Sequence, residues 1–101
     1  MSAPLPTAEV NTTKALPLIL LVEDSMTSME LISRDLREHY SLLHAHDGEE
    51  AWQLLLRASN VDLVVTDVQM PRVSGQELLT RIRQSDNPKI RSLPVIVMTT
   101  A

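Results

Sequence analysis

The sequence contains no cysteine and no phenylalanine, and Trp52 and Tyr40 are its aromatic residues. Without Cys the chain has no disulfide framework, no thiolate metal site and no Cys nucleophile, which suits a reducing cytosol. With so few aromatic rings, recognition of nucleic-acid bases by stacking is not expected. Basic residues are fewer than acidic ones: the chain has 9 Lys and Arg and 13 Asp and Glu, which gives a formal net charge of −4. This acidity argues against a nucleic-acid-binding surface, because phosphate backbones are bound by clustered cations.

Long hydrophobic segments are missing as well. The apolar run 16–22 is far shorter than the roughly 18 residues that a membrane-spanning helix needs. A signal peptide is not expected either, because Glu23-Asp24 follows the run where a small-residue cleavage site would stand. We therefore predict a cytoplasmic protein with no membrane partner.

Length and composition match one small domain. Of the 101 residues, 44 % are hydrophobic, which is enough for a buried core. Residues 1–15 are small and polar, contain proline and show no periodicity, which predicts a flexible N-terminal lead-in. The folded domain is expected over residues 16–101.

From Leu18 onward, apolar runs of strand length alternate with segments of helical periodicity. Strands are predicted over 18–22, 40–45, 63–67 and 95–99. Helices are predicted over 26–39 with Ser25 or Thr27 as N-cap, after Asp47 with Glu50 three residues on, and from Ser74 with Glu77 through Gln84. The segment 85–88 is predicted to end the third helix. The order β-α-β-α-β-α-β implies parallel strands, right-handed crossovers and helices on both faces, so we predict an α/β fold with a doubly wound parallel sheet in three layers.

Polar residues directly follow three of these strands. Glu23-Asp24 follows the first strand, Asp67 ends the third, and Thr99-Thr100 ends the fourth. In an open parallel sheet these ends share one edge, which is where such folds bind ligands. If the first and third strands are neighbours, Asp24 and Asp67 lie roughly 5 Å apart, one strand spacing. Carboxylates that close repel each other, and Mg²⁺ is the hard cation that suits a site with few protein ligands.

Each of these residues also has an ordinary structural explanation. A single Asp after a strand is most often a helix cap or a turn residue, and Asp24 is an alternative cap for the first helix. Asp67 is harder to explain in this way, because the next helix begins only near Ser74. A terminal Thr such as Thr99 is common in strands through β-propensity. The joint placement of these residues on one edge, rather than any one of them, indicates a site.

The sequence resembles the receiver domains of two-component response regulators from Leu16 to its last residue. The matching stretches are Ile19-Leu20-Leu21-Val22-Glu23-Asp24-Ser25, His46-Asp47-Gly48-Glu49-Glu50-Ala51, Asp62-Leu63-Val64-Val65-Thr66-Asp67-Val68-Gln69-Met70-Pro71, Ser74-Gly75, and Pro94-Val95-Ile96-Val97-Met98-Thr99. The D-x-x-M-P-x-x-S-G block that begins at Asp67 is the most specific of them. The resemblance implies a flavodoxin-like sheet of order 2-1-3-4-5 and a role in bacterial phosphorelay signalling, not that of an enzyme acting on a separate substrate.

The resemblance also implies a role for each matching site residue. Asp67 would accept a phosphoryl group from a phosphohistidine on a sensor histidine kinase or a histidine phosphotransfer protein. Mg²⁺ would be held by Asp24, Asp67 and the backbone carbonyl of Gln69, with Glu23 acting through a metal-bound water. Thr99 would be the switch hydroxyl that turns toward the phosphoryl group, since counting from Pro94 favours it over Thr100.

The family pattern includes a fifth strand, a fifth helix and a phosphate-binding Lys that this sequence does not contain, so we expect residues 16–101 to be a receiver domain incomplete at its C-terminus. The sequence does not specify an output domain or whether the protein forms a dimer.

Two other interpretations are a receiver-like interaction module that is not phosphorylated, and a Mg²⁺-dependent phosphohydrolase. The hydrolase usually has a second carboxylate where Gln69 stands. Without a fifth strand beside it, the apolar run 94–98 would form an exposed edge of the sheet. We expect the chain to associate through that edge.

Overall fold

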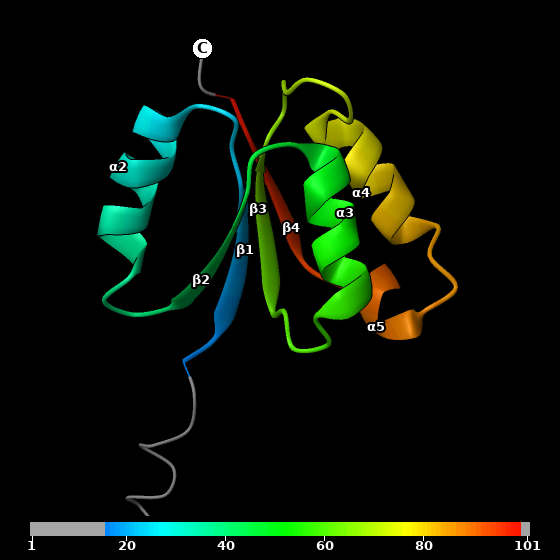
Figure 1. The fold of residues 1–101 in the computed structure, drawn as a ribbon. Helices are drawn as coiled ribbons and strands as arrows, with labels where there is room; N and C mark the ends of the chain where they lie inside the picture. The colour runs from blue at the N-terminus through cyan, green and yellow to red at the C-terminus, as the bar shows by residue number, and fades with distance from the viewer. Residues whose placement is uncertain (1–15, 100–101) are drawn as a thin grey trace, which may run out of the picture.

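The computed structural model describes residues 16–99 and consists of one parallel sheet with helices on both faces (Figure 1). The sheet has four strands in the order β2-β1-β3-β4. In chain order the elements are β1 (Leu18–Val22), α2 (Met26–Leu36), β2 (Ser41–Ala45), α3 (Gly48–Arg57), β3 (Leu63–Asp67), α4 (Gly75–Arg83), α5 (Pro88–Arg91) and β4 (Val95–Met98). The predicted doubly wound α/β architecture is confirmed, and the strand order matches the first four positions of the 2-1-3-4-5 arrangement.

The register of the central strands sets which residues meet at the carboxyl edge. In β1, Val22 is paired with Ala45 of β2 on one side and with Thr66 of β3 on the other. The residue after Val22 is therefore beside the last residue of β3, which in turn pairs with Met98 of β4. Parallel pairing thus brings residues from distant parts of the sequence to one edge.

The sheet separates two hydrophobic clusters. On one face, α2 alone packs on the sheet through Met29, against Ile19, Leu21 and Val65. On the other face, α3, α4 and α5 cover the sheet (Figure 1). The core of this second face is larger, and its buried residues are Leu20, Val22, Ala45, Ala51, Leu55, Val61, Val64, Val73, Leu78, Ile82, Ile90 and Leu93.

The N-caps of the three long helices are side chains that the sequence predicted. Ser25, rather than Thr27 or Asp24, caps α2, and its side chain accepts a hydrogen bond from the backbone N–H of Ser28. Asp47 caps α3 in the same way, and Ser74 forms both hydrogen bonds of a capping box with Glu77. These caps fix where the chain turns from strand to helix on the carboxyl side of the sheet.

Several predicted boundaries differ from the structure; among them, β2 begins at Ser41 instead of residue 40 and α4 ends at Arg83 instead of Gln84. The first helix ends at Leu36 instead of residue 39, because the backbone N–H groups of His39 and Tyr40 both turn back to the carbonyl of Leu36. The segment expected only to break the third helix also starts the short helix α5, where Asn87 accepts from the N–H of Lys89 and proline occupies the first turn. The last strand ends at Met98, one residue before Thr99.

Other sequence predictions fall partly or wholly outside this description. The N-terminal lead-in 1–15 and Thr100 lie outside the described residues, and no fifth strand occurs among residues 16–99. No helix in this part of the chain is long and apolar enough to cross a membrane.

Candidate functional site

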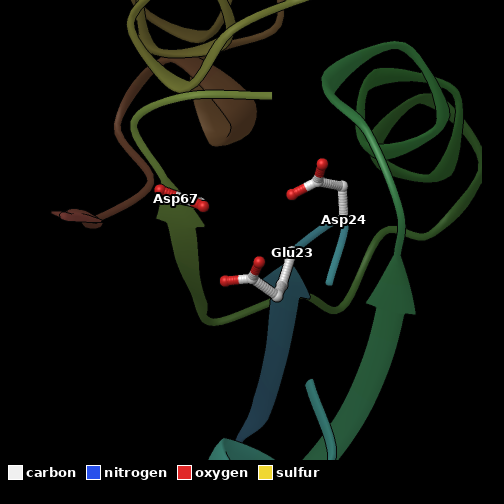
Figure 2. Close-up of side chains that lie close together, drawn as sticks. All are labelled: Glu23, Asp24 and Asp67. Atoms are coloured by element: carbon white, nitrogen blue, oxygen red, sulfur yellow. The ribbon is translucent and has the colours of Figure 1, made fainter. Parts of the chain in front are cut away.

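Three carboxylates meet where β1 and β3 end. Figure 2 shows Glu23 and Asp24, which follow β1, facing Asp67 at the tip of β3. One carboxylate oxygen from each of the three residues lies within 4.8 Å of the others. The strand register explains this proximity, since β1 and β3 are hydrogen-bonded neighbours.

Glu23 is the most buried of the three, with 1 % of its surface exposed. Its Oε2 accepts a hydrogen bond of 3.0 Å from the backbone N–H of Ser25. Its Oε1 is buried and has no hydrogen-bond partner. Burial raises the pKa of Glu23 above its usual value, the hydrogen bond from Ser25 opposes this shift, and the nearby Asp67 and Asp24 raise the pKa further. A buried charge is stable only when it is paired and fully hydrogen-bonded, and an ionised Glu23 has one oxygen without such a partner.

Asp67 is also buried, and the loop between β3 and α4 wraps around it. Its Oδ1 lies 3.3 Å from the backbone N–H of Gln69. The loop is held closed by a hydrogen bond of 3.1 Å from the N–H of Gly75 to the carbonyl of Val68. A Cβ on Gly75 would overlap the carbonyl oxygen of Asp67, so only glycine lets α4 begin this close to the strand end.

A pocket of about 450 Å³ opens above these carboxylates. It is lined by Glu23, Asp24, Ser25, Ser28, Asp67, Val68, Gln69 and Thr99. The structure thus brings Glu23, Asp24, Asp67, Gln69 and Thr99, which the sequence singled out separately, into one pocket. No Lys or Arg is among the described residues that line it.

Sequence reasoning missed Ser28 and Val68 as pocket residues. Ser28 lies in the first turn of α2, three residues after the cap Ser25, and this helical spacing is the signal that could have identified it. Val68 has no such signal, because its place depends on the path of the loop after β3. Lys89 and Arg91 belong to α5, which lies at the other end of the sheet, so they do not reach the pocket (Figure 1).

The donor set fits a hard divalent cation. All three side chains offer carboxylate oxygens, which Mg²⁺ prefers, and the carboxylates converge on one point. The unpartnered Oε1 of Glu23 is an acceptor that a cation, or water around it, would satisfy. A cation would also offset the repulsion among three negative groups.

A doubly wound parallel sheet with an acidic pocket at the carboxyl ends of its strands defines a class of α/β proteins that bind charged ligands at that edge. Within this class the chain belongs to the response regulator receiver domain family, whose profile matches residues 19–101. It is therefore a receiver domain of the two-component response regulator type, and such domains are signalling modules that bind Mg²⁺ at an acidic pocket and interact with histidine kinases or phosphotransfer proteins.

Similar proteins occur in a bacterium and in a plant. The chain is 36 % identical over 84 residues to a chemotaxis protein CheY homolog of Campylobacter jejuni, which covers 81 % of this chain and 63 % of that protein. It is 34 % identical over 84 residues to the two-component response regulator ORR5 of Oryza sativa, covering 82 % of this chain and 61 % of that one. The chain thus spans less than two thirds of the length of these relatives.

Solved structures show the same fold. The response regulator TrrA of Thermotoga maritima, in complex with Mg²⁺ and BeF, has a TM-score of 0.76 at 32 % identity, covering 85 % of this chain and 71 % of that one. The chemotaxis protein CheY4 of Vibrio cholerae has a TM-score of 0.77 at 28 % identity, covering 86 % and 71 %.

Proposed function

We propose that this receiver domain accepts a phosphoryl group on Asp67, with Mg²⁺ as cofactor and Thr99 as the switch hydroxyl. The observation that carries the proposal is the convergence of three carboxylates within 4.8 Å at the base of a pocket whose lining includes Thr99. The proposal takes residues 16–101 as the receiver domain. It also assigns the chain to the cytoplasm, in line with the absence of cysteine.

In the proposed reaction, Asp67 acts as the nucleophile. A carboxylate oxygen of Asp67 attacks the phosphorus of a phosphohistidine on a histidine kinase or phosphotransfer protein, and the new O–P bond forms as the P–N bond breaks. The electron pair returns to the imidazole nitrogen, which takes up a proton from water. The product is an acyl phosphate, which water hydrolyses to restore the carboxylate.

The other pocket residues hold and neutralise the reacting groups. Asp24, Asp67 and the backbone carbonyl of Gln69 would be the protein ligands of Mg²⁺, with Glu23 as an outer partner through water. Bound Mg²⁺ supplies positive charge to the acceptor carboxylate and to the transferred oxygens. The N–H groups of Ser25 and Gln69, which donate to Glu23 and Asp67, keep both carboxylates oriented.

Phosphorylation adds negative charge and new acceptor oxygens at the strand edge. Thr99 lies in the same pocket as Asp67 and carries the hydroxyl donor that such oxygens would attract. Because Thr99 directly follows β4, its rotation toward Asp67 would move the end of that strand. This local electrostatic change is the proposed output signal.

Incubation with acetyl phosphate and Mg²⁺ tests the proposal, on a protein that joins residues 16–101 to the fifth strand and Lys of the family pattern. The intact mass should rise by one phosphoryl group, Asp67→Asn should abolish the adduct, and EDTA should prevent it. Asp62→Asn is the matched control, because Asp62 is an exposed carboxylate at the other end of β3, and it should be phosphorylated like the unchanged chain.

Two outcomes would contradict the proposal. An unmodified mass together with intact Mg²⁺ binding would favour an interaction module that is not phosphorylated. Steady turnover of a small phosphoester by the chain would favour a phosphohydrolase.

A further inference from the structure

A groove separate from the acidic pocket lies between α3 and the turn that joins α4 to α5. The helices α3, α4 and α5 lie on the face of the sheet opposite to α2 (Figure 1). The groove has a volume of about 530 Å³, and a hollow of about 80 Å³ adjoins it and shares Leu56, Asn87 and Ile90 with it. None of the residues that line the groove or the hollow lines the acidic pocket.

The floor of the groove is apolar. Trp52 and Leu56 are one helical turn apart on α3, so they lie on the same face of that helix, and Ile90 of α5 lines the groove beside them. Trp52 is partly buried against the larger of the two cores, whereas Leu56 is 55 % exposed. Tryptophan is enriched at the centres of protein contact surfaces, and here the chain's single Trp lies in a groove beside an exposed Leu.

Two further cations, Lys89 and Arg91, lie beside the groove, whose own lining holds Arg81 and Asp86. Nη1 of Arg91 donates a hydrogen bond of 2.9 Å to the carbonyl of Ser85, another lining residue. Lys89 lines the adjoining hollow. Among the described residues, Arg81 has an ion pair with Glu49, whereas Lys89 and Arg91 have none.

The positive charges of Lys89 and Arg91 contrast with the net charge of the whole chain, which is −4. Asp86 is the one carboxylate among the described residues that line the groove. The carbonyl that holds Arg91 in place does not neutralise its charge. Apolar residues in the groove, with Lys89 and Arg91 beside them, therefore favour an acidic partner with apolar anchors.

We propose that the groove between α3 and the α4–α5 turn binds an acidic amphipathic helix of a partner protein. A cleft between two helices accepts a third helix, whose apolar residues would fill the floor at Trp52, Leu56 and Ile90. Carboxylates on the flanks of that helix would pair with Lys89 and Arg91. This proposal does not depend on the phosphorylation of Asp67, since the two sites share no residue.

Trp52 makes the test direct, because it is the only Trp and its emission reports on the groove alone. The probe is a synthetic helical peptide of about 20 residues with Leu at every third or fourth position, Glu flanking the Leu face and Ala elsewhere. Two matched peptides carry Lys in place of Glu, or Ser in place of Leu. A saturable change in Trp52 emission is expected with the acidic peptide only, and it should weaken as salt is added.

Matched variants distinguish binding at the groove from nonspecific binding elsewhere on the protein. Leu56→Lys should weaken binding about tenfold or more. Lys89→Glu should weaken it several-fold and reduce its dependence on salt. Leu31→Lys on α2 is the control, because Leu31 is 51 % exposed on the other side of the molecule, and this variant should bind like the unchanged chain.

The proposal is overturned if the acidic peptide leaves Trp52 emission unchanged, or if the Lys peptide binds equally well. It is also overturned if Leu31→Lys weakens binding as much as Leu56→Lys does. A response to anionic phospholipid vesicles that exceeds the response to the acidic peptide would assign the groove to a membrane surface instead.

Discussion

The two ends of the parallel sheet use carboxylates in different ways. At the amino end, Oδ2 of Asp62 accepts a hydrogen bond of 2.8 Å from the backbone N–H of Leu18, the first residue of β1. At the carboxyl end, Glu23 is buried with one oxygen that has no hydrogen-bond partner, next to Asp24 and Asp67. The first carboxylate stabilises the fold by satisfying a strand N–H, whereas the cluster at the other end concentrates like charges.

Carboxylates therefore have opposite effects on stability at the two ends of the sheet. A carboxylate that meets one N–H in a partly solvated place contributes modestly to folding. Three carboxylates within 4.8 Å, two of them buried, oppose folding until a cation joins them. Substitutions at the two ends should therefore separate fold stability from metal binding.

The largest effect on stability is expected from Gly75→Ala at the carboxyl end. Alanine would normally favour a helix over glycine, but here its Cβ overlaps the carbonyl oxygen of Asp67. We expect the free energy of unfolding to fall by about 2 kcal/mol, because backbone rather than a flexible side chain must move. Urea denaturation followed by circular dichroism measures this change.

The neighbouring Gln76→Ala is the control for Gly75→Ala. Gln76 is exposed on the same turn of α4, and its substitution should change the free energy of unfolding by less than about 0.5 kcal/mol. Equal effects of the two substitutions would show that the tight approach of α4 to β3 does not constrain the strand end.

A smaller effect of opposite sign is expected from Glu23→Gln. Removing the buried charge should raise the free energy of unfolding of the metal-free chain by on the order of 1 kcal/mol. The same change should weaken Mg²⁺ binding, so the stabilisation that added Mg²⁺ gives should be smaller for the variant. Denaturation curves with Mg²⁺ and with EDTA measure both effects.

The pH dependence sharpens this prediction. Because burial raises the pKa of Glu23 in the folded state, the folded chain binds a proton at pH values where the unfolded chain has lost it. The stability of the metal-free chain should thus decrease as the pH rises through the raised pKa of Glu23. Glu23→Gln should lack that decrease, and an identical pH profile for both proteins would contradict the assigned cause.

The smallest effect is expected from Asp62→Ala at the amino end. The substitution removes the acceptor of the Leu18 N–H, which water can replace because Asp62 is exposed. We expect a loss of about 0.5–1 kcal/mol in the free energy of unfolding. Mg²⁺ binding by isothermal titration calorimetry should be unchanged, and a change in it would remove the distinction between the two ends.

Much of the fold could be predicted because its signals are local. The apolar run of β1 and the capping side chains Ser25, Asp47 and Ser74 act on nearby backbone, and the structure has them where the sequence indicated. The end of α2 was misjudged because the return of the chain at Leu36 is a turn that helical periodicity does not mark. The helix α5 was missed because four residues are too few to show a period.

Local patterns were enough to predict the alternation of strands and helices, the starts of the three long helices, and the acidic residues that follow the strands. These features depend on the period of apolar residues and on hydrogen bonds that span a few positions. Packing between distant segments leaves an oxygen of Glu23 without a partner, brings Ser28 to the pocket, and gathers Trp52, Leu56 and Ile90 in one groove. The physical reason is that burial and charge proximity arise between segments far apart in the chain, where strand register and helix packing set the distances.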